Sequence, residues 1–212
     1  MEMAKAGSLS LPNWNDTTTL LLDMPLLLAA ALMPIFRDPF TAYGVSNIVW
    51  LALLIYGLWQ LLRRADCPLH LRFLALFLIL TPYSYTEVLG YANCLLVQSA
   101  YYLVRAVYMV YLLYGLVQLE QREKGFGHLI TWLFTLGLGA WIAMSSGIFM
   151  LLLVLLPVIA GFVLRAFAAN HPRLLLGPGA AFLALNLLGF GAGYFVQRYV
   201  IHFASRDAVI AW

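Results

Sequence analysis

The stretch Gly147–Phe167 reads GIFMLLLVLLPVIAGFVLRAF, and it decides the class of fold. It has the length of about 20 residues that a helix needs to cross a bilayer, and Arg165 is its one charged residue. In lipid, a continuous apolar run satisfies its own backbone groups only as a helix. No stretch of the chain shows the period of two that a membrane barrel requires. The sequence therefore predicts a membrane-spanning helix here.

The composition extends this prediction to the whole chain. Of 212 residues, 64% are hydrophobic and 10% are charged, whereas a soluble domain is about half apolar and about a quarter charged. Nine acidic and twelve basic residues are too few to cover a soluble fold. We expect an all-α polytopic membrane protein with one transmembrane domain over residues 1–212. Its abrupt end after an apolar stretch predicts that it is the N-terminal part of a longer protein.

Six further stretches approach spanning length, and they predict a bundle of six or seven transmembrane helices. They are Leu20–Phe36, Val45–Leu62, Leu71–Tyr85, Leu95–Leu119, His128–Met144 and Leu174–Phe203, the last starting near Pro178. The first is interrupted by Asp23, Pro25 and Pro34. If it spans, there are seven helices; if it lies along the outer surface, there are six. A cleaved signal peptide is a third reading, which Asp23 disfavours.

The basic residues predict the orientation. Lys and Arg are enriched in cytoplasmic loops, and they occur in the connections at 63–72, 120–127 and 165–173. The alternate connections, 82–93 and 145–147, contain none. We therefore expect a multi-pass protein of the bacterial inner (cytoplasmic) membrane with the basic connections inside and the C-terminus outside.

Two arginines and two cysteines complete this topology. Arg37 and Arg206 fall on the expected outer side and run against the rule, but the other bases outnumber them. Cys67 and Cys94 fall at opposite faces, so no disulfide is expected between them.

Arg105 is the clearest candidate for a binding residue. It lies about ten residues into the stretch Leu95–Leu119, roughly 15 Å deep at 1.5 Å per residue. An ionisable group at such depth is costly and marks a functional site by default. It either receives an anionic group, such as a lipid phosphate, from the outer side, or forms a structural pair with Glu87.

Aromatic hydroxyls surround this arginine in the sequence. Tyr101, Arg105 and Tyr108 share one helical face. A polar, aromatic cavity open to the outer side would suit a sugar or a lipid headgroup, whereas an interfacial belt or plain packing would explain the tyrosines without a ligand. The candidate substrate-binding residues are Arg105, Glu87, Tyr85, Tyr101, Tyr102 and Tyr108.

Other site classes leave little trace. The histidines lack metal-ligand spacing, so we expect no metal and no cofactor. A net charge of +3 is too small to indicate nucleic acid. Gly189 and Gly193 form a small-xxx-small face, which predicts close packing against a partner helix.

Three segments resemble the N-terminal membrane half of a bacterial GT-C-type glycosyltransferase. The first is Asp23–Phe36, followed by Arg-Asp-Pro-Phe, and the second is Ser-Ala-Tyr-Tyr-Leu-Val-Arg at 99–105. The third is Leu138–Gly147, a glycine and short turn leading to an apolar run and Pro157.

This resemblance implies inverting transfer of a sugar from a polyprenyl-phosphate donor at the outer face. It implies that Asp16 or Asp23 acts as the catalytic carboxylate and that Arg105 holds the leaving phosphate. Asp16, within Asn15–Thr17, reads equally well as a helix N-cap. The alternative function is non-catalytic: a polytopic protein that packs against partners or moves a lipid or another hydrophobic ligand.

The topology can be checked by labelling single cysteines in intact cells after Cys67 and Cys94 have been replaced. Cysteines at Asp66, Glu123 and Asn170 should resist an impermeant reagent, whereas cysteines at Gly90 and Ser146 should react. The reverse labelling pattern would invert the orientation.

Overall fold

The computed structural model describes residues 24–81, 103–120, 126–146, 150–168 and 177–200. Every regular element within these ranges is helical, which confirms the all-α prediction for this part of the chain. The elements are α2 (Met24–Phe36), α3 (Pro39–Arg64), α4 (Leu69–Leu80), α6 (Leu103–Glu120), α7 (Phe126–Ser146), a π-helical segment η3 (Leu151–Leu155), α9 (Leu156–Ala168), α10 (Pro178–Phe195) and a second π-helical segment η5 (Val196–Val200).

Four of the described helices are long and apolar enough to cross a membrane, so the chain is an integral membrane protein. They are Pro39–Arg64, Gly127–Ser145, Leu151–Ala168 and Pro178–Tyr199. Three shorter apolar helices, Pro25–Phe36, Leu69–Leu80 and Leu103–Leu119, coincide with the other expected spans. The 13 residues of α2 give about 20 Å of helix, less than the thickness of about 30 Å of a bilayer core. The total of six or seven crossings therefore stays a prediction.

The start of α3 differs from the sequence prediction. The span was expected to begin at Val45, after a loop, but the helix begins at Pro39. Asp38 explains the earlier start, because its carboxylate accepts a hydrogen bond from the Thr41 backbone N–H at 2.8 Å, and proline is well suited to the first helical position. Hydrogen bonds from the Thr41 hydroxyl and N–H lower the pKa of the Asp38 carboxyl, so the cap stays charged as the pH falls toward its usual titration range.

The end of α4 also differs. The expected span reached Tyr85, but the helix ends at Leu80 and Thr81 is extended. The next residue in the sequence is Pro82, and a residue before proline is sterically disfavoured in the helical conformation. The same kind of constraint shapes η3, because Pro157 lacks an N–H and its ring displaces the carbonyl four residues earlier. The wider turn appears in the bond from the Leu156 N–H to the Leu151 carbonyl.

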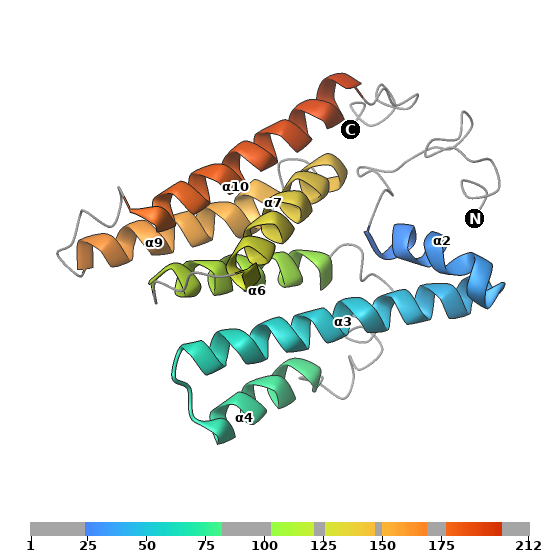
Figure 1. Ribbon diagram of the computed structural model, residues 1–212, viewed down its shortest axis with the longest axis horizontal. Coiled ribbons are helices and arrows are strands. Elements are labelled where there is room, and N and C mark those ends of the chain that lie inside the picture. The colour runs from blue at the N-terminus through green and yellow to red at the C-terminus, as the bar shows by residue number, and fades with distance from the viewer. Residues whose placement is uncertain (1–23, 82–102, 121–125, 147–149, 169–176, 201–212) are drawn as a thin grey trace, which may run out of the picture.

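The helices pack in a defined order. α3 lies against α2, α4 and α6, while α7 lies against both α6 and α10. Figure 1 shows α3, α6 and α9 ending on the left of the view, where α4 and α10 begin. The ends that flank the three basic connections therefore gather at one end of the molecule, which we call the basic end.

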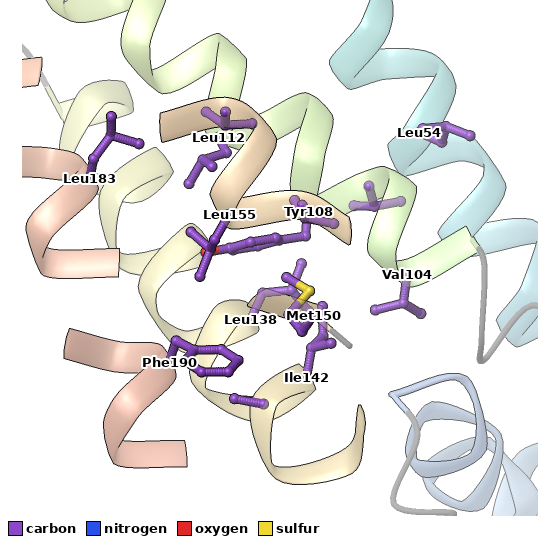
Figure 2. Close-up of a cluster of buried hydrophobic side chains, with 14 of the residues drawn as sticks. Leu54, Val104, Tyr108, Leu112, Leu138, Ile142, Met150, Leu155, Leu183 and Phe190 are labelled. Atoms are coloured by element: carbon purple, nitrogen blue, oxygen red, sulfur yellow. The ribbon is translucent and has the colours of Figure 1, made fainter. Parts of the chain in front are cut away.

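The core forms where α6, α7 and α10 meet. Tyr108, Leu112 and Phe182 are among its fully buried side chains, and Figure 2 shows Tyr108 lying across the cluster between Leu155 and Leu138. The closest helix crossing is made by Gly193 of α10, where an added Cβ would overlap the carbonyl group of Ala140 in α7. Gly189, one turn earlier, leaves space for Leu136, whose Cδ1 would lie 2.6 Å from an added Cβ.

This crossing makes a testable difference between two neighbouring glycines. Gly193→Ala should lower the melting temperature in detergent, because overpacking costs about 1–3 kcal/mol. Gly191→Ala is the matched control, since a Cβ there meets no atom within 4 Å and alanine favours helix. Equal melting temperatures for the two variants would contradict this packing.

Candidate functional site

Most of the site residues indicated by the sequence fall outside the described ranges. These are Asp16, Asp23, Tyr85, Glu87, Tyr101 and Tyr102. Gly189 and Gly193 are described, and their small-residue face is covered by α7 of the same chain. The predicted pairing of Arg105 with Glu87 therefore stays a prediction.

Arg105 lies near the first described residue of α6. Its side chain is half-buried, and its Nε atom is shielded from solvent by protein. The depth expected for Arg105 depends on a helix beginning at Leu95, and residues 95–102 lie outside the described ranges.

Tyr108 lies in the core. Its side chain is 0% exposed, and its hydroxyl donates to Asn186 Oδ1 at 3.1 Å. Asn186 in turn donates from Nδ2 to the Phe182 carbonyl at 3.0 Å. The absence of a side chain at Gly139 makes room for the tyrosine ring, whose hydroxyl oxygen lies 2.7 Å from where a Cβ would be. Tyr108 therefore links α6 to α10 as a structural residue and does not line an outward-open cavity.

A cavity of about 570 Å³ lies elsewhere, between α3, α6 and α7. We call it the polar cavity. Its volume falls within the range of about 300–1,000 Å³ typical of small-molecule sites. It is lined by Leu53, Tyr56 and Arg64 of α3, by Tyr111, Tyr114 and Gln118 of α6, and by Gly127, His128, Ile130, Thr131 and Phe134 of α7.

The polar cavity has a polar end and an apolar end. Arg64 is the last residue of α3, Gln118 is in the last turn of α6 and His128 is in the first turn of α7, so all three lie at the basic end. Leu53 and Phe134 lie further along their helices; Leu53 is about 16 Å from Arg64 at 1.5 Å per residue. The lining thus changes from charged to apolar with increasing depth in the helix bundle.

Local packing explains how the polar cavity is built. Gly57 lets α3 and α6 approach closely, because an added Cβ would lie 2.6 Å from the ring of Tyr111. That ring packs edge-on against Phe134 of α7, with 4.9 Å between centroids. At the polar end, the guanidinium of Arg64 lies 5.3 Å from the centroid of the Tyr114 ring, so the arginine is held at the cavity wall.

Two polar atoms at the polar end have unmet hydrogen-bonding capacity. Gln118 is only 3% exposed, and its Oε1 has no hydrogen-bond partner among the described residues. The same holds for Nδ1 of His128, whose ring lies 5.3 Å from that of Trp132. An unpaired buried acceptor costs about 1–3 kcal/mol, so a ligand that pairs with it gains that energy.

The α7 helix adds a further feature to the polar end. Gly127 and His128 belong to its first turn, where backbone N–H groups lack intrahelical acceptors and the helix dipole is positive. Thr131 Oγ1 donates to the Gly127 carbonyl at 3.0 Å. Together with Arg64, this turn makes the polar end electropositive, which favours an anion.

Sequence reasoning missed this site. It used Arg64 as a marker of topology and treated His128 as a loop histidine. One signal was available: Tyr111, Tyr114 and Gln118 are spaced by three and four residues, which puts them on one face of α6. No spacing rule connects that face to Arg64 and His128, because they lie on other helices.

Comparison with known proteins gives no assignment: the chain matches no protein family, no curated protein and no solved structure.

The structural role of Tyr108 can be tested by a double-mutant cycle. Tyr108→Phe should destabilise the protein by about 0.5–2 kcal/mol, because it leaves Asn186 Oδ1 unpaired. Adding Asn186→Leu should cost less than the sum of the single changes. Tyr111→Phe serves as a control on the same helix. Strict additivity in unfolding measurements would rule out the bond.

Proposed function

We propose that this integral membrane protein binds a lipid phosphate in the polar cavity. The observation that carries the proposal is the gradient along the cavity, from Arg64 at the basic end to Leu53 and Phe134 at depth. A membrane lipid has the same gradient, with a charged headgroup at the surface and an apolar chain below it.

The side of the cavity favours a ligand that enters from the bilayer. Tyr56 is 57% exposed and Ile130 is 50% exposed, and both line the cavity while lying on helices apolar enough to span. An acyl or prenyl chain between these two side chains would remain in contact with lipid. The headgroup would then meet Arg64, whose planar guanidinium matches two phosphate oxygens.

A more specific candidate is the GT-C-type glycosyltransferase that the sequence resembles. In this candidate the protein lies in the bacterial inner membrane with its C-terminus outside and transfers a sugar from a polyprenyl phosphate at the outer face. Asp16 or Asp23 would act as base, and Arg105 would hold the leaving phosphate. The half-buried position of Arg105 supports this candidate. Both functions require a lipid phosphate, but they use opposite ends of the helix bundle.

Thermal stabilisation of delipidated protein by added lipid tests the proposal. Phosphatidylglycerol should stabilise the wild type and phosphatidylcholine should not. Arg64→Met should weaken the phosphatidylglycerol effect about ten- to hundredfold, since a charge-assisted hydrogen bond contributes about 1.5–3 kcal/mol. Arg63→Met is the matched control, because Arg63 is the exposed neighbour outside the cavity.

A second variant guards against misfolding. Gly127→Leu should fill the cavity without strain, because a Cβ at Gly127 meets no described atom within 4 Å, and Gly137→Leu is its control on the same helix. Wild-type binding by both Arg64→Met and Gly127→Leu would overturn the proposal. Loss of polyprenyl-phosphate binding in Arg105→Met, but not in Arg64→Met, would favour the glycosyltransferase instead.

A further inference from the structure

The unmet acceptor of Gln118 carries information about the headgroup. Gln118 Oε1 is buried, lines the polar end and has no hydrogen-bond partner among the described residues. An ionised phosphodiester presents only acceptor oxygens, so it can pair with Arg64 but not with Gln118 Oε1. A ligand that satisfies both residues must carry a hydrogen-bond donor beside its phosphate.

The donor is better supplied by a hydroxyl than by an amine. None of the described lining residues is acidic, whereas Arg64 contributes a positive charge. An ammonium headgroup would be held beside that charge and the positive end of α7 without a compensating carboxylate, which is unfavourable. A hydroxyl donates without adding charge.

His128 and the cavity size point the same way. The Nδ1 atom of His128 is a second shielded position without a partner in the described part of the chain, and an imidazole nitrogen can pair with a hydroxyl. Two such positions suit a group with more than one hydroxyl. A cavity of about 570 Å³ is large enough for a small polyol next to a phosphate.

We infer that the headgroup bound in the polar cavity is a hydroxylated phosphodiester, with a sugar or polyol whose hydroxyl donates to Gln118 Oε1 while the phosphate contacts Arg64. This inference rests on the proposed function, because it names the substrate class of the same site. The shared chemistry could belong to a membrane lipid or to a free polyol phosphate.

Two lipids of equal charge test the inference. Phosphatidylglycerol and phosphatidylmethanol are both singly charged phosphodiesters, but only the first carries headgroup hydroxyls. Delipidated wild-type protein should bind phosphatidylglycerol about tenfold more tightly, because one buried acceptor is satisfied. Gln118→Met replaces the amide by an apolar group of similar length, so the two lipids should then bind equally. Gln60→Met is the matched control, since Gln60 also has a shielded Oε1 without a partner among described residues but does not line the cavity.

Each outcome separates this inference from the proposed function. Equal binding of both lipids by the wild type, still abolished by Arg64→Met, would overturn the inference and leave the lipid-phosphate site standing. A preference that survives in Gln118→Met would also overturn it. Arg64-independent binding would overturn the proposed function. If Gln118→Met fails to fold, Gln118→Leu with Gln60→Leu repeats the comparison.

One further arm identifies the source of the headgroup. Glycerophosphoglycerol has the headgroup of phosphatidylglycerol without its acyl chains. Much weaker binding than that of the lipid would support a membrane ligand. Equally tight, Gln118-dependent binding would support the hydroxylated phosphate and overturn the lipid as its source.

Discussion

The close crossing of α7 and α10 is the constraint on which the bundle depends. In a bilayer no hydrophobic force drives helices together, so association relies on close packing and on a few polar contacts. Gly193 meets the Ala140 carbonyl without a side chain between them. The nearby Tyr108–Asn186 hydrogen bond then ties α6 to the same pair. These contacts fix α6, α7 and α10 as one packed unit, with α3 added on the other side of α6.

The polar cavity follows from how α3 joins this unit. Gly57 brings α3 close to α6 at the Tyr111 ring. Nearer the basic end, the side chains between the helices are Arg64, Gln118 and His128, which do not close the space. The core is therefore tight at Tyr108 and open at the basic end. An opening lined by a cation and by an unmet acceptor costs stability, which a suitable ligand returns.

Much of the fold follows from the sequence, but the site does not. Apolar runs place the helices because hydrocarbon leaves the backbone no other solution, and Pro178 marks the start of α10 as expected. The boundaries at Pro39 and Leu80 were wrong because capping by Asp38 and the constraint of Pro82 act on single residues within apolar runs. The partner of Tyr108 could not be predicted, since Asn186 lies 78 residues away. Likewise, Arg64 and Gln118 meet only through tertiary packing.

The most direct measurement is the distance between the Arg64 guanidinium and a lipid phosphorus in a bilayer. Solid-state NMR can detect it as dephasing of the arginine side-chain nitrogen signal by phosphorus, with the Arg64 signal identified by its loss in Arg64→Met. We expect strong dephasing of Arg64 in phosphatidylglycerol bilayers, and its loss when Gly127→Leu fills the cavity. An Arg64 signal without dephasing, or dephasing unchanged by Gly127→Leu, would contradict a lipid phosphate in the polar cavity.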